Sequence, residues 1–404
     1  MTTEPSSPSA RSLRAAARWL LWPLLAVLGA VALVVVVPPT DGDDPRPPAA
    51  GAWVALADAG IAGRSEPSVV WTRNAMIVWG GTGEAGVLGD GASYDLATGR
   101  WAPLAPASLG PRRGQSAVWT GTRMIVFGGL GPREGCDGLC ALGDGAVYDP
   151  IAKAWTPMAP APIEPRHGHT AVFLQNRMVV WGGASLSGAA LGDGAAYDPV
   201  ADTWDPLPVP PLAPRLGHRA VATTDRMLVW GGSSEAAEGG RYFADGAVYS
   251  PATNGWSAMA APPASLEARD NAAGVWTGNQ LLVWGGYGRS DACTPCFYGD
   301  GAAYDLSSNS WAPIAPSPLG GRGAHRAVWT GREMLVWGGF DSAVQGDGAL
   351  YNPFDDAWVA MAPGPLPARQ HHAMVWTGQQ LIVWGGAGTA GMLADGAVLT
   401  PRAF

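Results

Sequence analysis

Seven arginines recur through the chain at a fixed distance from seven glycine pairs. Each arginine stands 16 residues before a Gly-Gly pair, and each pair is followed by an Asp-Gly step. A guanidinium group can bind a carboxylate through two parallel hydrogen bonds. The arginines could therefore hold an acidic ligand, or they could pair with the repeated aspartates and brace the structure. Pairing is the favoured interpretation, and ligand binding stays open for Arg64, Arg112, Arg166, Arg215, Arg269, Arg322 and Arg369.

All four cysteines lie in two short segments, Cys136-x3-Cys140 and Cys293-x2-Cys296. In an exported chain, closely spaced cysteines of this kind usually form local disulfides. A four-cysteine zinc site has a similar spacing, but it would require two distant segments to meet. Two disulfides, one in each segment, are therefore the prediction.

Four of the six histidines stand three residues after a repeated arginine: His169, His218, His325 and His372. Such recurrence indicates a structural position, and metal binding by His167 and His169 is the minor alternative. The sequence contains no recognisable nucleophile motif, phosphate-binding loop or distinct carboxylate pair. We therefore predict no catalytic residue, no metal and no cofactor.

The repeated residues belong to a module of roughly 51 residues. Each module contains short runs rich in β-forming residues, bounded by Gly, Pro and Asp, which predicts four short strands. A tyrosine follows the Asp-Gly aspartate by four residues in six copies, and a tryptophan follows that tyrosine by seven. These tryptophans are predicted to wedge between neighbouring modules: Trp53, Trp101, Trp155, Trp204, Trp256, Trp311 and Trp358.

The tryptophan of the seventh module is predicted to come from the N-terminal end of the repeat region. The seventh module stops at Phe404, before its own tryptophan, whereas Trp53 stands 11 residues before Arg64, as its counterparts do in most other copies. The segment around Trp53 is therefore predicted to supply the last strand of the seventh module. Closure of the ring in this way removes the open sheet edges.

This pattern resembles the kelch repeat, whose members share the Gly-Gly pair, the tyrosine and the tryptophan seven residues later. The resemblance covers about residues 51–404. It implies an all-β fold, a seven-bladed kelch-type β-propeller closed by an N-terminal strand.

The amino terminus has the pattern of a membrane anchor. Residues 1–18 are polar and carry three arginines, and residues 19–37 contain no charge. That run is long enough to cross a bilayer as one helix, and the arginines before it place residues 1–18 in the cytoplasm. A cleaved signal peptide is the alternative. We expect a Pro-rich linker at 38–50 and a propeller, 51–404, outside the cytoplasm of a single-pass membrane protein.

The links between the second and third predicted strands vary most, from 6 to 13 residues. Loops on a rigid scaffold commonly carry function, so this face is the predicted binding face. The residues of the longest links predicted to bind a ligand are Arg241, Tyr242, Tyr287 and Tyr298.

The predicted function is that of a monomeric binding module for an extracytoplasmic protein or a glycan. A net charge of −8 argues against a nucleic-acid partner. The resemblance also allows an enzyme similar to the periplasmic kelch sialic-acid mutarotases. That enzyme would need a loop glutamate near unpaired arginines, and the candidates are Glu134, Glu235, Glu238 and Glu267. A purely architectural surface protein is the third hypothesis.

Overall fold

The computed structural model describes residues 51–234, 240–290 and 293–401. The predicted cytoplasmic tail, membrane anchor and proline-rich linker, together with Glu235 and Glu238, lie outside the described residues. In the three described segments, no helix is long and apolar enough to cross a membrane.

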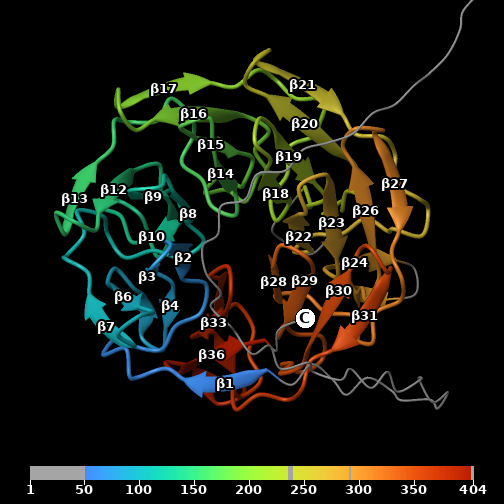
Figure 1. The fold of residues 1–404 in the computed structure, drawn as a ribbon. Helices are drawn as coiled ribbons and strands as arrows, with labels where there is room; N and C mark the ends of the chain where they lie inside the picture. Colours follow the sequence, from blue (N-terminus) through green and yellow to red (C-terminus); the bar gives the residue numbers. More distant parts are fainter. Residues whose placement is uncertain (1–50, 235–239, 291–292, 402–404) are drawn as a thin grey trace, which may run out of the picture. The chain divides into compact units, whose positions relative to one another are not determined.

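Seven antiparallel sheets of four strands each surround a common centre (Figure 1). Blades 1 to 7 are numbered in the order of their innermost strands. These are β2 (Ser68–Trp71), β8 (Ser116–Trp119), β14 (Thr170–Leu174), β18 (Arg219–Ala222), β22 (Ala273–Trp276), β28 (Arg326–Trp329) and β32 (Ala373–Trp376). The second strands are β3 (Ala75–Trp79), β9 (Met124–Phe127), β15 (Arg177–Trp181), β19 (Met227–Trp230), β23 (Gln280–Trp284), β29 (Met334–Trp337) and β33 (Leu381–Trp384).

The third strands are β6 (Gly91–Asp95), β12 (Gly145–Asp149), β16 (Gly194–Asp198), β20 (Gly246–Ser250), β26 (Gly301–Asp305), β30 (Gly348–Asn352) and β36 (Gly396–Thr400). The outermost strands are β7 (Arg100–Pro103), β13 (Ala154–Pro157), β17 (Thr203–Pro206), β21 (Gly255–Ala258), β27 (Ser310–Pro313), β31 (Ala357–Ala360) and β1 (Ala52–Ala55).

Within the described residues, four of the links between second and third strands form short hairpins of their own. Their strands are β4 (Thr82–Gly83) with β5 (Gly86–Val87), β10 (Leu130–Gly131) with β11 (Cys140–Ala141), β24 (Tyr287–Ser290) with β25 (Cys293–Phe297), and β34 (Ala387–Gly388) with β35 (Gly391–Met392).

The ring closes as the sequence predicts. Strand β1 pairs antiparallel with β36, so that Trp53 lies opposite Leu399. Figure 1 shows the first described strand, in blue, beside the last, in red. Blade 7 is therefore completed by the N-terminal strand of the propeller.

The hydrophobic core consists of seven clusters, each lying between two neighbouring blades. In every one, the tryptophan of an outermost strand packs against the aromatic side chain that ends the second strand of the preceding blade. For example, the ring centroids of Trp155 and Trp79 are 5.5 Å apart, and those of Trp53 and Trp337 are 6.3 Å apart. These tryptophans therefore lie between neighbouring blades.

The Gly-Gly pairs are required by both backbone conformation and space. The first glycine of each pair has a φ of 66–72° and the second a φ of 95–110°, a region that favours glycine. A Cβ at Gly182 would also lie 2.6 Å from Cε1 of His218 in the next blade. The repeated histidine of one blade therefore packs against the first glycine of the pair in the preceding blade at each such boundary.

Candidate functional site

The seven repeated arginines pair with the seven repeated aspartates, each within its own blade. The shortest nitrogen–oxygen distances range from 2.6 to 3.0 Å, and the arginine side chains are at most 2% exposed. The aspartates, about half exposed, are Asp90, Asp144, Asp193, Asp245, Asp300, Asp347 and Asp395.

These arginines also bond to the backbone. In blade 3, Arg166 donates from Nη1 to the carbonyl oxygen of Gly182, and its own carbonyl accepts from Gly129 of blade 2. In blade 2, burial raises the pKa of Asp144, but the hydrogen bond and charge of Arg112 outweigh burial and lower that pKa overall. The arginines therefore brace the blades. In the described part of the chain none of them lines the central cavity, and ligand binding through them stays a prediction.

A central cavity of ≈ 840 Å³ lies where the innermost strands begin. It lies on the face that carries the variable links, and it is lined by residues from those links and from the segments just after the repeated arginines. Two smaller hollows, of ≈ 440 and ≈ 530 Å³, lie between neighbouring blades. A cavity of about 300–1,000 Å³ can hold a small ligand or one group of a larger one.

Seven residues with a left-handed backbone conformation form a ring at the cavity, and six of them line it. The second residue after each repeated arginine has a positive φ, between 50° and 66°. Backbone hydrogen bonds join most neighbours in this ring, such as Asn271 N to Gly217 O at 3.0 Å. Three members are glycines, and four carry side chains at a strained backbone position: Glu66, Asn271, Ala324 and His371.

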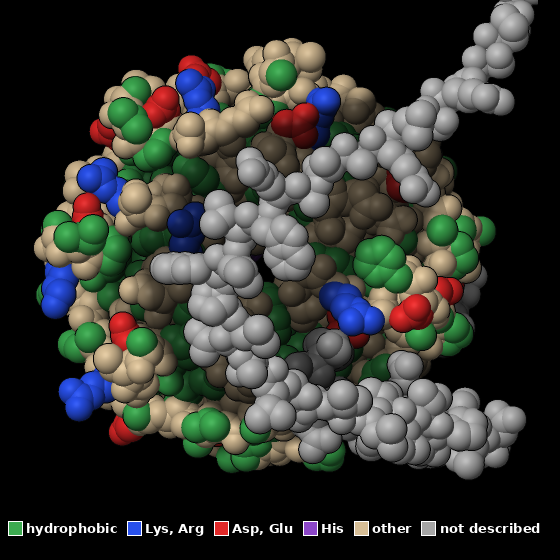
Figure 2. Space-filling view, viewed as in Figure 1, with side chains coloured by type: hydrophobic (Ala, Val, Ile, Leu, Met, Phe, Trp, Pro, Cys, Tyr) green, Lys and Arg blue, Asp and Glu red, His purple; other side chains and the backbone are tan. Residues whose placement is uncertain are grey.

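Basic side chains outnumber acidic ones in the cavity. Four arginines line it, Arg113, Arg219, Arg289 and Arg326, against two carboxylates, Glu66 and Asp270. The excess is two positive charges (4 − 2), although the whole chain has a net charge of −8. Over the described part of the face in Figure 2, by contrast, acidic and basic side chains are interspersed around the rim. The cavity is therefore a local basic site in an acidic protein.

Two of the histidines that line the cavity, His167 and His371, do not add to this charge at neutral pH. Burial and the charge of Arg113 lower the pKa of His167. Burial also lowers the pKa of His371, although its neighbour Glu66, 3.9 Å away, acts in the opposite direction. Both imidazoles are therefore neutral at pH 7.

Asp270 is the buried carboxylate of the cavity, 7% exposed. It accepts hydrogen bonds from the hydroxyl of Ser233 (3.0 Å) and from the side-chain amide of Asn271 (3.2 Å). Burial raises the pKa of Asp270 to about 6, although these hydrogen bonds lower it. The amide of Asn271 also donates to the hydroxyl of Tyr287 at 3.1 Å, which holds this ring at the cavity wall.

The predicted link residues divide into two groups. Tyr242 and Tyr287 both line the cavity, with ring centroids 6.3 Å apart. Arg241 lies over the ring of Phe243, and Tyr298 lies under the guanidinium of Arg269. These last two pack on the links and do not line the cavity.

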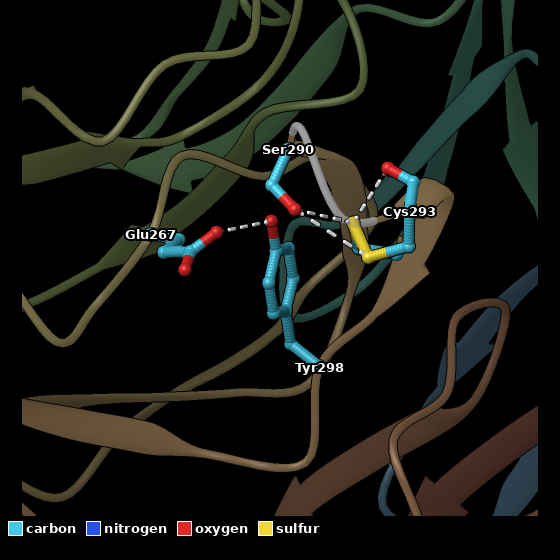
Figure 3. Close-up of a disulfide and its surroundings, with 5 residues drawn as sticks. Glu267, Ser290, Cys293 and Tyr298 are labelled. Carbon is cyan, nitrogen blue, oxygen red and sulfur yellow. Dashed lines mark hydrogen bonds between the residues drawn. A yellow bond between two sulfur atoms is a disulfide. The ribbon is translucent and has the colours of Figure 1, made fainter.

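The predicted disulfides join Cys136 to Cys140 and Cys293 to Cys296. The second braces the β24–β25 hairpin, whose residues Arg289, Thr294 and Pro295 line the cavity. Figure 3 shows this disulfide near Tyr298, whose hydroxyl donates to the Glu267 carboxylate at 2.9 Å. A zinc site shared by the four cysteines is therefore ruled out as long as these bonds are formed.

The four repeated histidines are at most 7% exposed, and two of them bond to a hydroxyl group of the preceding blade. His169 bonds to the hydroxyl of Ser116 in the preceding blade at 2.9 Å, and His218 bonds in the same way to Thr170 at 2.7 Å. Burial, followed by nearby positive charge, lowers the pKa of His169 to about 3. Within the described residues, no group of three or more His, Cys, Asp or Glu side chains is arranged to hold a metal ion.

Several cavity residues were not predicted as site residues: Glu66, Arg113, Arg219, Asp270, Arg289, Arg326 and His371. Most occupy the first, second or fourth position after a repeated arginine. At the fourth position, Arg219 and Arg326 replace the serine, threonine or alanine of the other five copies. Comparison of the copies position by position would have found this signal.

Comparisons with known proteins agree with the fold. The family profile of the KLHDC2/KLHL20/DRC7 Kelch-repeats domain matches residues 53–212 and 158–339. A solved structure titled "Structure of YjhT" matches with a TM-score of 0.61 and 15% sequence identity, over 76% of this chain and 99% of that chain. Likeness at this identity shows the fold alone. No curated protein sequence matches significantly.

Proposed function

Because the chain belongs to the Kelch-repeat family, we propose that it is a binding module that holds a protein or a glycan ligand in its central cavity. The observation that carries the proposal is the break in repetition. The blades are nearly identical where they pack, but the residues around the cavity differ from copy to copy. Structural need alone does not explain why Glu66, Asn271 and His371 occupy strained positions that glycine fills in other copies.

The cavity also has the composition of a binding site. Tyrosines such as Tyr242 and Tyr287 offer large rigid faces, and the arginines, Ser233 and Asn271 offer hydrogen bonds. The variable links surround these residues and can set specificity.

The proposed location is outside the cytoplasm, with residues 19–37 as the tether. The uncharged length of this segment and the arginines before it support an anchor. The two disulfides support an oxidising compartment, since such bonds are rare in the cytosol.

An enzyme is the second candidate, and one observation favours it. Asp270 is a buried carboxyl group in the cavity wall with a pKa near 6, a value suited to proton transfer. The glutamates predicted from the sequence fit this role less well. Glu267 accepts the hydrogen bond of Tyr298, and neither it nor Glu134 lines the cavity.

The test uses the full-length chain in lipid nanodiscs, screened on a glycan array and against envelope extracts. A Tyr242→Ala/Tyr287→Ala variant should lose the ligands that the wild type captures. The matched control is Val200→Ala, on the β16–β17 turn, where the side chain is 93% exposed. Equal capture by all three proteins would contradict a cavity site. Turnover of a sugar that disappears in Asp270→Asn would favour the enzyme.

A further inference from the structure

Two arginines of the cavity differ from all the others in how they are held. Arg219 begins the innermost strand of blade 4, and Arg326 begins that of blade 6. Between them, blade 5 has the small residue Ala273 at the same position. Both side chains line the cavity, one on each side of the blade whose residue at this position is small.

Each guanidinium is anchored through one nitrogen only. Arg219 donates from Nε to the carbonyl oxygen of Ala272 at 2.7 Å, and Arg326 donates from Nε to that of His372 at 3.1 Å. Both acceptors belong to the following blade. A Cβ at Gly274 would lie 2.4 Å from Cγ of Arg219, so the side chain lies directly on blade 5. These contacts fix the position of each guanidinium.

The terminal nitrogens of Arg219 and Arg326 have no hydrogen-bond or ion-pair partner among the described residues. The nearby carboxylates are engaged elsewhere. Glu66 pairs with Arg113 at 3.3 Å, and Asp270 accepts from Ser233 and Asn271. The terminal nitrogens of both guanidinium groups therefore donate to no acceptor in the described part of the protein.

The carboxylates of the cavity compensate the positive charges of the two groups only in part: the charge of Asp270 acts on Arg219 and that of Glu66 acts on Arg326, without a direct ion pair among the described residues. Burial, followed by the charge of Arg326, lowers the pKa of Arg219 to about 10, and burial lowers the pKa of Arg326. With a pKa of about 10, Arg219 remains charged at neutral pH. Two neighbouring positive charges, partly removed from water, are unfavourable unless a negative group joins them.

We propose that Arg219 and Arg326 form an oxyanion subsite in the central cavity, which takes a carboxylate, phosphate or sulfate group of the ligand. The inference rests on the proposed function, because it assigns a chemical class to the ligand of the same cavity. The planar guanidinium donors match such oxygens in pairs. Arg289 lines the same cavity and adds to the positive potential around them, whereas the charge of Arg113 is paired with that of Glu66.

The experiment measures thermal unfolding and calorimetric binding of the full-length chain in nanodiscs. The probes are malonate, phosphate and sulfate, each compared with chloride at constant ionic strength. At least one should raise the melting temperature in a saturable way, and their ranking distinguishes a planar from a tetrahedral oxyanion. In Arg219→Gln/Arg326→Gln the binding should weaken by about 10–100-fold, since hydrogen bonds between charged groups are lost.

Arg73→Gln/Arg100→Gln, which removes the same charge from exposed positions, should bind the anion like the wild type. Without anion, Arg219→Gln/Arg326→Gln should melt no lower than the wild type, whereas Arg166→Gln should melt lower because it loses a structural ion pair. If none of the probes stabilises the wild type in a saturable way, the subsite is wrong. It is also wrong if Arg219→Gln/Arg326→Gln responds to the anions as the wild type does.

The two proposals fail separately. If the tyrosine variant loses a captured ligand but the arginine variant keeps it, the cavity binds and the subsite is wrong. If anions bind through the arginines but no ligand depends on Tyr242 and Tyr287, the subsite stands and the proposed function is wrong.

Discussion

Truncation of one tryptophan tests how far the propeller depends on its N-terminal strand. Trp53 is half-buried, packs on Trp337 and lies against Gly364, where a Cβ would come within 2.8 Å of the indole. Trp→Ala in a core costs about 3–5 kcal/mol. Partial exposure puts Trp53→Ala at the lower end of that range, about 3 kcal/mol.

The melting temperature converts this loss into an observable. The entropy of unfolding is about 2.1 cal/mol/K per residue, so it is about 0.7 kcal/mol/K for a propeller of roughly 350 residues. A loss of about 3 kcal/mol therefore lowers the melting temperature by about 4 °C. Calorimetry of the full-length chain, supported by urea denaturation, can resolve this shift.

The matched control lies on the same strand. Val54 is 63% exposed, so Val54→Ala should change the free energy of unfolding by less than about 0.5 kcal/mol. Equal melting of Trp53→Ala and wild type would refute the argument that strand β1 closes the ring. Equal losses in the two variants would point to a general effect of the strand and not to the wedge.

Three further predictions concern ionisable groups. The four repeated histidines have lowered pKa values, so their contribution to stability is present above pH 6.5 and is lost on acidification. Urea titrations should show that the free energy of unfolding falls by about 2 kcal/mol by pH 5 for each histidine whose pKa is about 3. Asp270 acts in the opposite direction, because its raised pKa costs stability as pH rises from about 4 to 6. Asp270→Asn should therefore gain up to about 3 kcal/mol at pH 7 and nothing near pH 4, and a gain independent of pH would contradict this assignment. Asp193→Asn should lose about 1–3 kcal/mol because buried Arg166 loses its charged partner, whereas the exposed Asp225→Asn should lose almost nothing.

Repetition explains why the fold could be predicted from the sequence. A Gly-Gly pair, a tyrosine or a tryptophan that returns at the same spacing must serve a role that every blade shares. The departures fit as well: Leu399, where six copies have tyrosine, still pairs with the Trp53 strand. Even the pairing of Arg166 with Asp193 followed from the matched spacing of the two series.

The cavity was harder to predict because its residues share no motif. Whether the side chain after a repeated arginine faces the cavity depends on the left-handed residue that follows it. The composition does not reveal that residue's backbone conformation. Tyr242 and Tyr287 were found because they lie in long links. Tyr298, from the same link as Tyr287, packs on Arg269 instead, and only the structure separates the two.

The pairing of β1 with β36 also limits when the protein can finish folding. One partner of this pair is synthesised about 350 residues before the other, from the positions of Trp53 and Leu399. Until the ribosome has released the last strand, blade 7 lacks its third strand and β1 has no edge to join. The short apolar strand β1 therefore stays unpaired through almost the whole of synthesis. A factor that binds the nascent chain during this time would have to protect it from other contacts.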